Sequence, residues 1–385
     1  MPITNDNAVL ILGAGASAQF NLPIGGDLLA EIRNNIADEI SETRNDILDY
    51  NPSYALRAFY NSGSHQPRPS SYQLTPIFAT YLSIKSPDFR ASGNDIQEIL
   101  EEAKTAVKYL TGQTADTIDA FIAENPSVSM IVKIAIANIF FDRLYSRSKT
   151  STIPSWALNP LTDRMLGEEE KAERNWVHLL INLARHAYKN EWVSEQNKLK
   201  IITFNYDTVL ETILDTAFSN TELDLPDWTE LIEIKHMHGC MPRLAPEVSN
   251  PFETTAEMAT AIEVATEPDP RAEVVADREI AKTWVEASIK IYACGFAFAG
   301  PNCRLLGLDR DIALLPPGER YIKFCNYDGN PGITNSASRY GVFDPNKQVG
   351  RAGLRKLLIE SRPNPGDKLS ITNWFYRGVP GELPA

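Results

Sequence analysis

The stretch from residue 8 to residue 29 reads AVLILGAGASAQFNLPIGGDLL, and it decides the fold class. Its short apolar run, Ala8–Leu12, predicts a buried strand, and the apolar positions that resume at Leu28 predict a helix. Between them, Gly13 and Gly15 form a glycine turn with the pattern Gly-x-Gly-x-x-Ala. In α/β sheets such a turn leaves backbone N–H groups free to face a phosphate. A strand-to-helix turn that binds nothing would carry the same glycines, so both interpretations stay open.

The feature that normally confirms a dinucleotide fold is missing. An ordinary fold of this kind has a second strand that ends in an acidic residue roughly twenty residues further on. Here that distance falls within AEIRNNIADEI, residues 30–40, whose apolar spacing is helical and continues to Tyr50. Asp27 is the expected N-cap of this helix. The chain therefore leaves the sheet early.

Composition narrows the classes of function. The chain has 385 residues, 43% of them hydrophobic, and a net charge of −13, which argues against a nonspecific nucleic-acid surface. It has no run of eighteen apolar residues and no signal-peptide pattern at its beginning, so we expect a cytoplasmic protein with no membrane contact. The four cysteines form no Cys-x-x-Cys pair, so we expect no metal site.

The middle of the chain is helical in pattern. Apolar residues recur at helical spacing over 96–110, 128–145 and 174–192, with no convincing strand among them. We therefore predict an α/β fold with a Rossmann-like, mostly parallel sheet, a large helical insertion domain and no zinc module. The predicted domains are 1–34 with 196–385 for the sheet, and 35–195 for the insertion.

Strands return after residue 196, and most end in polar or glycine-containing segments. The expected strands are Lys200–Phe204, a short strand within Leu231–Cys240, Ser288–Phe296 and Tyr321–Asn326. Because open α/β sheets bind ligands beyond the carboxyl ends of their strands, these segments are site candidates. Between the second and third of them, Ala256–Glu286 is rich in Ala and Glu and predicts a solvated helix with a turn at Glu267–Pro270.

Four motifs stand at the ends of predicted strands in a fixed order: Gly13-Ala14-Gly15-Ala16-Ser17, Thr203-Phe204-Asn205-Tyr206-Asp207, His238-Gly239 and Gly295-Phe296. This ordered set resembles the sirtuin-like NAD-binding family, in particular the NAD hydrolases of bacterial antiphage defence. The segment Thr117–Phe121 also resembles a Ser-Ile-Asp-x-Phe motif of that branch. This likeness draws attention to Asp119, whose other interpretation is a solvated carboxylate in a helix.

The departures from protein-deacylating sirtuins are equally informative. Leu22-Pro23 is followed by Ile24-Gly25-Gly26 and not by the Asp-Phe-Arg of the deacylases. The four-cysteine zinc module that helps form their acyl-lysine cleft is also impossible here. Deacylation is therefore disfavoured, and the resemblance implies only the chemistry at the nicotinamide end of NAD.

The resemblance implies specific roles for the strand-end residues. Asn205 would fix a water and the nicotinamide ribose, His238 would deprotonate the water or a ribose hydroxyl, and Asp207 would support both. The expected NAD-binding residues are Gly13, Ala14, Gly15 and Ser17 at the pyrophosphate, Thr203 in the second motif, and Gly295, Phe296 and Asn302 toward the adenosine half. Asn205 as a helix cap and His238 as a core histidine remain alternatives. His236 is the weaker candidate for the base, because methionine and not glycine follows it.

The resemblance therefore implies an NAD⁺ hydrolase that depletes NAD in abortive infection, with NAD as substrate and no metal. Control in that branch comes from homo-oligomers and, in some systems, from a separate ATPase of the helicase or translocase type. This chain has no Gly-x-x-x-x-Gly-Lys-Ser/Thr loop, so an ATPase would be another protein. The alternatives are a silent NAD- or ADP-ribose-binding module or structural subunit, and a nuclease-associated partner without activity. The sequence also does not distinguish hydrolysis, which gives linear ADP-ribose, from cyclisation, which gives cyclic ADP-ribose.

Overall fold

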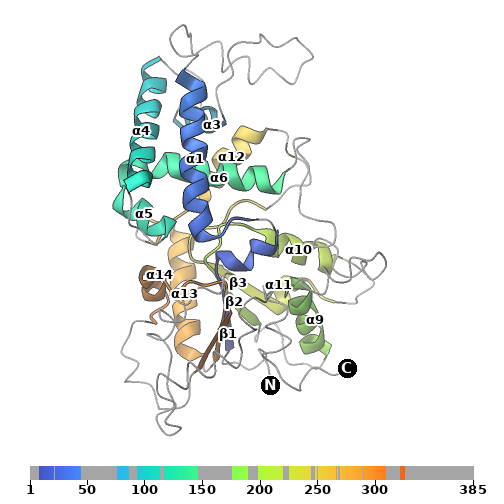
Figure 1. The fold of residues 1–385 in the computed structure, drawn as a ribbon. Coiled ribbons are helices and arrows are strands. Elements are labelled where there is room, and N and C mark those ends of the chain that lie inside the picture. The colour runs from blue at the N-terminus through green and yellow to red at the C-terminus, as the bar shows by residue number, and fades with distance from the viewer. Residues whose placement is uncertain are drawn as a thin grey trace, which may run out of the picture. The chain divides into compact units, whose positions relative to one another are not determined.

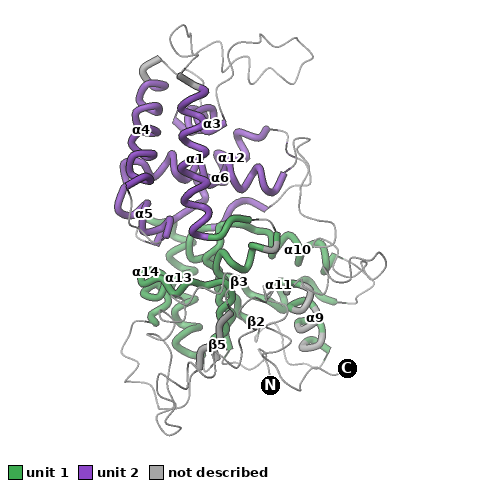
Figure 2. Tube along the Cα trace, viewed as in Figure 1, with its two compact units in different colours: residues 1–24, 153–239, 268–385 green, residues 25–152, 240–267 purple. Residues whose placement is uncertain are grey.

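The computed structural model describes residues 8–20, 22–44, 76–85, 93–112, 117–145, 176–189, 198–219, 225–243, 248, 250–265, 267, 269–288, 290–308 and 321–325. The chain divides into two compact units (Figure 2). A sheet unit comprises Met1–Ile24, Ile153–Gly239 and Pro268–Ala385, and a helical unit comprises Gly25–Thr152 and Cys240–Glu267. The expected bounds are wrong in three places: the helical unit begins at Gly25, its first segment ends at Thr152 so that residues 153–195 belong to the sheet unit, and it takes in a second segment after Gly239.

The sheet unit is built on five parallel strands in the order β3-β2-β1-β4-β5. They are β1 (Ala8–Leu12), β2 (Leu199–Thr203), β3 (Ile232–His236), β4 (Lys290–Cys294) and β5 (Tyr321–Cys325). All five residues of β1 are buried, as expected for a central strand covered on both faces. The predicted α/β fold with a parallel Rossmann-like sheet is confirmed, and each predicted strand lies within two residues of an observed one.

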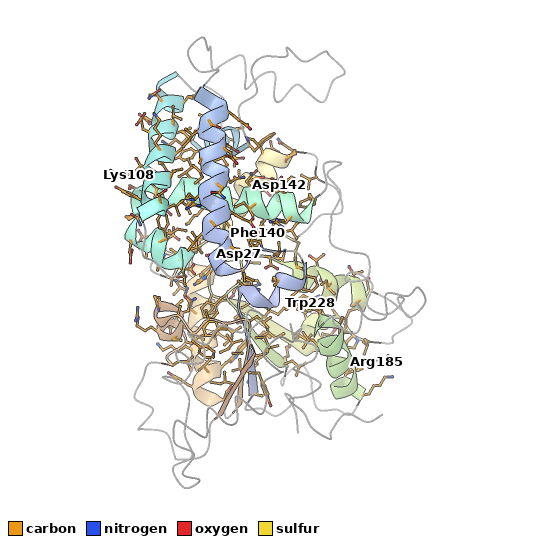
Figure 3. All side chains as sticks on the ribbon, in the orientation of Figure 1. Asp27, Lys108, Phe140, Asp142, Arg185 and Trp228 are labelled. Atoms are coloured by element: carbon orange, nitrogen blue, oxygen red, sulfur yellow. The ribbon has the colours of Figure 1, made fainter. Side chains whose placement is uncertain are left out.

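Helices cover both faces of this sheet (Figure 1). On one face lie α13 (Ala272–Ala287) and α14 (Gly300–Leu305), and on the other lie α9 (Trp176–Lys189) and α10 (Val209–Phe218). Apolar side chains of β1, β2 and β4 meet those of α13 and α14 in one buried cluster. A short helix, α11 (Trp228–Leu231), leads into β3, and Figure 3 labels its Trp228. The Trp228 indole donates to Asp215 of α10 at 2.6 Å.

The helical unit packs around α6, whose residues are apolar on almost every side. Its elements are α1 (Gly25–Arg44), α3 (Pro76–Lys85), α4 (Gly93–Gly112), α5 (Ile118–Glu124), the 3₁₀ helix η5 (Pro126–Val128), α6 (Ser129–Leu144) and α12 (Pro251–Ala261). A helix that is hydrophobic all round belongs in a core, and α6 contacts α1, α3, α4 and α12. Phe140 of α6 is buried (Figure 3), and Lys133 pairs with Glu267 at 2.6 Å.

Three local predictions need correction or a limit. Asp27 is not an N-cap, because α1 begins at Gly25 and Asp27 lies in its first turn. The predicted continuation of this helix over 45–50 lies outside the described residues. Over Ala256–Glu286, the helices α12 and α13 lie on either side of the predicted turn at Glu267–Pro270, but both bury apolar side chains, so the expected solvated character is wrong. Val274, Trp284 and Val285 of α13 are among the buried residues.

Candidate active site

The carboxyl ends of the strands bring the predicted motifs to one edge of the sheet. Leu12 of β1 is in register with Thr203 of β2 and with Cys294 of β4, and Thr203 is in register with His236 of β3. The segments that follow these residues therefore emerge side by side. The chain order reverses at β1, which lies between β2 and β4, so this edge is also the topological switch point where α/β sheets bind ligands.

The glycines at this edge allow the loops after β1 and β4 to touch. Gly13 N–H donates to Cys294 O at 3.0 Å, and Gly15 N–H donates to Gly295 O at 3.3 Å. A Cβ on Gly13 would lie 2.4 Å from the Gly295 carbonyl oxygen. Gly295 has a φ of +62°, and its own Cβ would lie 2.4 Å from Ala16 N. Both positions therefore require glycine for close packing of backbone against backbone.

Most amides of this turn are bonded within the protein, and Ala14 N–H is the exception among residues 13–17. Besides the two bonds to the β4 loop, Ala16 N–H donates to Gly13 O at 2.8 Å and Ser17 N–H donates to Ala14 O at 3.1 Å. The turn closes into two 3₁₀ helices, η1 (Ala14–Ala16) and η2 (Ala18–Phe20), and no α-helix follows it directly. A phosphate role for Gly13, Ala14 and Gly15 stays a prediction, and it requires Gly13 and Gly15 to exchange their present bonds while Ala14 N–H has none of them to give up.

Ser17, Asn205 and Asp207 form a buried hydrogen-bonded chain at the ends of β1 and β2. The Ser17 hydroxyl donates to Asp207 Oδ2 at 2.9 Å and accepts from Asn205 Nδ2 at 2.9 Å. The backbone N–H of Val209 donates to Asp207 Oδ1 at 3.1 Å, which ties the carboxylate to the start of α10. Asn205 Oδ1 is buried and has no hydrogen-bond partner among the described residues.

The direction of this chain follows from the ionised carboxylate. Ionised Asp207 can only accept, so the Ser17 hydroxyl must donate to it. The Ser17 oxygen must then accept from the Asn205 amide, which turns Asn205 Oδ1 away from Ser17. Asn205 is therefore presented as a hydrogen-bond acceptor, suited to a water or a hydroxyl group.

Burial changes the acidity of Asp207. It raises the pKa of the Asp207 carboxyl from 3.8 to about 6, and the charge of nearby Glu211 adds to the rise. The hydrogen bonds from Ser17 and Val209, and the proximity of His236, oppose it. Asp207 is consequently ionised at neutral pH, although its proton is held far more tightly than in water.

His238 lies among aromatic rings that flank Asn205 in the sequence. Its ring centroid is 5.2 Å from that of Phe204, edge to face, and 5.8 Å from that of Tyr206, stacked. Only 1% of His238 is exposed. Since Phe204 and Tyr206 are the neighbours of Asn205, these contacts bring the histidine segment after β3 against the segment that carries Asn205 and Asp207.

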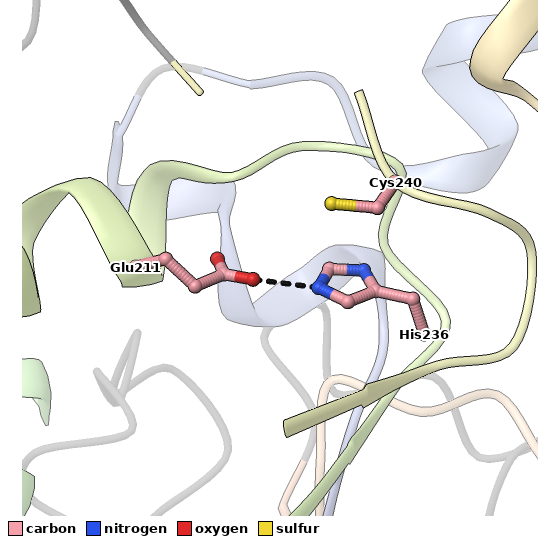
Figure 4. Close-up of side chains that lie close together, drawn as sticks. All are labelled: Glu211, His236 and Cys240. Atoms are coloured by element: carbon pink, nitrogen blue, oxygen red, sulfur yellow. Dashed lines mark hydrogen bonds and ion pairs between the residues drawn. The ribbon is translucent and has the colours of Figure 1, made fainter. Parts of the chain in front are cut away.

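A second polar pair lies beside this chain (Figure 4). His236 Nε2 is 2.6 Å from Glu211 Oε1, and both side chains are buried. Ligand atoms around tetrahedral Zn²⁺ lie about 3.3 Å apart, so the shorter separation fits a shared proton. Cys240, also drawn in Figure 4, is the first residue of the returning segment of the helical unit.

The remaining predicted residues have other surroundings. Thr203 Oγ1 accepts from Asn205 N–H at 3.1 Å, so it holds the backbone that precedes Asp207. The Phe296 ring packs against Phe204 within the hydrophobic core, with centroids 4.9 Å apart. Asn302, in the first turns of α14, is buried, and its Oδ1 has no hydrogen-bond partner among the described residues.

Asp119 belongs to the helical unit, and the strand-end residues belong to the sheet unit. It lies in the first turn of α5 and is buried, with 9% of its surface exposed. Thr117 caps the same helix by accepting from Ala120 N–H at 3.2 Å. Burial contradicts the alternative interpretation of Asp119 as a solvated carboxylate, while its role in a site stays a prediction.

Sequence reasoning missed Glu211 and the two residues of α13 that contact the end of β3, Asp277 and Arg278. The spacing of Asp207 and Glu211, four residues apart, was a signal that both could lie on one side of the start of α10. No comparable signal marked Asp277 and Arg278, because they lie about forty residues from their partners in a segment of ordinary helical composition.

Comparisons with known proteins do not assign the chain to a family. No model of a known family matches the chain, and no curated protein is significantly similar to it. In the described part of the chain, no helix is both long enough and apolar enough to cross a membrane.

Proposed function

We propose that this protein is an NAD⁺ glycohydrolase, which cleaves the bond between nicotinamide and ribose to release nicotinamide and ADP-ribose. The observation that carries the proposal is the chain of Asn205, Ser17 and Asp207, whose Asn205 Oδ1 is buried without a hydrogen-bond partner among the described residues, beside the buried His238. A buried carboxamide oxygen without a partner costs about 1–3 kcal/mol. A water or a ribose hydroxyl that donates to Asn205 Oδ1 removes that cost on binding.

The proposed reaction suits this set of groups. Nicotinamide leaves as a neutral molecule, so no acid is needed, and the sugar passes through an oxocarbenium-like transition state. Asn205 would orient the attacking water or a ribose hydroxyl, and His238 would accept its proton. Asp207 would maintain the direction of the Asn205 amide through Ser17 and supply negative charge near the cationic sugar.

The proposal includes a biological role. We place the activity in antiphage defence, as an NAD-depleting effector of abortive infection, because the ordered motifs resemble that branch of sirtuin-like proteins. An enzyme that destroys NAD needs restraint, so control by homo-oligomerisation or by a separate helicase- or translocase-type ATPase is part of the proposal. A direct role in binding nucleic acid is not part of it, since the net charge is −13.

The decisive test is the purified protein with NAD⁺, followed by chromatography for nicotinamide and for linear and cyclic ADP-ribose. Asn205→Ala and His238→Ala should each reduce nicotinamide release by about 100-fold or more, as expected for groups that orient or deprotonate the nucleophile. Asn34→Ala, an exposed position on α1, is the matched control and should be unchanged.

The same assay separates the alternatives. Nicotinamide release that survives both site substitutions would show that the site is assigned wrongly. Wild-type protein that binds NAD⁺ by calorimetry but never releases nicotinamide, alone or with the product of a neighbouring gene, would instead identify a binding module.

A further inference from the structure

Side chains of α13 bind the backbone at the end of β3, two residues before His238. The N–H of His236 donates to Asp277 Oδ2 at 3.3 Å, and the carbonyl of Met237 accepts from Arg278 Nε at 2.9 Å. Two consecutive residues of α13 therefore bind the backbone of two consecutive residues of β3 and its extension. Met237 N–H also donates to Thr203 O of β2 at 2.9 Å.

The side chain of His236 adds a bond from another helix. Its contact with Glu211 at 2.6 Å joins the end of β3 to the first turn of α10, which begins directly after the segment of Asn205 and Asp207. The two segments that carry the proposed catalytic residues are thus cross-linked by one short buried bond. Hydrogen bonds between a carboxylate and a histidine are stronger than neutral ones when the histidine is charged.

Burial makes these contacts costly to lose. Arg278 is 8% exposed and Glu211 is 4% exposed, so removing a partner leaves polar groups without water to replace it. Gly239 follows His238 with a φ of +71°, a conformation that glycine adopts without strain and that turns the chain immediately after the histidine. The backbone on both sides of His238 is therefore fixed, by Arg278 before it and by the glycine turn after it.

We infer that Glu211, Asp277 and Arg278 form a His238 clamp, a set of positioning residues that fixes the proposed general base relative to Asn205. None of the three contacts the substrate in this role, which rests on the proposed function. Small displacements of a catalytic group, near 1 Å, lower rates by about 100-fold. The His238 clamp should accordingly act on the chemical step and leave the binding of NAD⁺ nearly unchanged.

The first test is steady-state kinetics of NAD⁺ cleavage by the full-length protein. Arg278→Met removes the donor to Met237 O and keeps the apolar length of the side chain. It should lower kcat by about 10- to 100-fold while KM stays within about threefold, and Arg278→Lys should recover part of the rate. Arg271→Met, at the exposed N-cap of the same helix, is the matched control and should change neither constant.

The second test does not depend on activity. The chain has 5 histidines, so protein labelled with ¹⁵N-histidine gives few imidazole signals, and His238→Gln assigns the one of interest. Arg278→Met should shift or broaden the His238 signals, and Arg271→Met should leave them in place. Glu211→Gln keeps the shape of the side chain and removes its charge, and it should shift the His238 signals less than Arg278→Met does. If Arg278→Met does not fold, Glu211→Gln is the deciding variant.

The outcomes separate this inference from the proposed function. Wild-type protein without NAD⁺ cleavage, but with His238 signals that respond to Arg278→Met, would overturn the proposed function and support the His238 clamp. His238 signals unchanged in both Arg278→Met and Glu211→Gln would overturn the His238 clamp, whatever the activity. A kcat that stays at the wild-type value in folded Arg278→Met would overturn it as well.

Discussion

Asp207 should make the stability of the protein depend on pH in a direction opposite to that of a salt-bridged aspartate. Its folded pKa is about 6, against 3.8 when exposed to water. Between these values the folded state retains a proton that the unfolded state has lost, so stability falls as pH rises through this window. Since one pKa unit is about 1.4 kcal/mol, ionised Asp207 lowers the free energy of unfolding by about 3 kcal/mol above pH 6, relative to its protonated form.

Asp207→Asn isolates this effect, because the amide stays neutral in both states. If the amide forms weaker hydrogen bonds than the carboxylate, the free energy of unfolding of the variant changes by a constant amount at every pH. From pH 4 to pH 7 the variant should therefore gain roughly 5 °C in Tm relative to the wild type, at about 2 °C per kcal/mol, because about 2.4 of the 3 kcal/mol is lost in this window. Calorimetry or circular dichroism at several pH values measures it.

A matched control is Asp227→Asn. Asp227 is exposed, and hydrogen bonds from Thr229 hold its pKa below the ordinary value, so its Tm difference should be flat above about pH 5. A flat profile for Asp207→Asn over the same range would refute the argument that burial holds a proton on Asp207. If the argument holds, kcat of the wild type should rise as pH passes 6, because ionised Asp207 sets the direction of the Asn205 amide through Ser17.

Three further substitutions, and one control for the last of them, test the packing by thermal unfolding. Gly13→Ala would bring a Cβ within 2.4 Å of a carbonyl oxygen of the β4 loop and should cost about 1–3 kcal/mol; an unchanged Tm would show that the two loops do not touch in solution. Gly239→Ala should cost about 1–2 kcal/mol, because φ is +71°. Lys133→Met leaves Glu267 without its partner at 2.6 Å and should cost about 2 kcal/mol, while Lys104→Met, in an exposed pair, should cost under about 0.5 kcal/mol.

The sequence predicted the sheet well because its strands are short apolar runs followed by turn residues. β1 and β4 are central strands, and their burial on both faces produces the continuous apolar pattern that identifies them. Asn205 and His238 could be placed at one edge for the same reason, since parallel strands direct their carboxyl ends to the same side.

What the sequence did not predict depends on partners that are far apart in the chain. The amides of Gly13 and Gly15 are occupied by Cys294 and Gly295, about 280 residues away, and no local pattern indicates such a contact. Arg278 looked like part of a solvated helix, but the face of α13 that carries it packs against β3. Composition gives the charge of a helix and does not show which of its charged residues faces a strand.

The polar groups at the strand ends indicate which parts of a ligand this conformation can recognise. Asn205 and Asn302 offer buried carboxamide oxygens, which are acceptors, and complementary ligand groups are therefore hydroxyls and amines. NAD carries such groups on its riboses, its carboxamide and its adenine. Its phosphates need donors, and Gly15 N–H can supply one only by giving up Gly295 O, at a cost of about 1–3 kcal/mol if that carbonyl stays buried. In the proposed NAD⁺ site, separation of the β1 and β4 loops would free Gly15 N–H for the pyrophosphate, whereas Ala14 N–H makes none of the hydrogen bonds that close the turn and needs no such exchange.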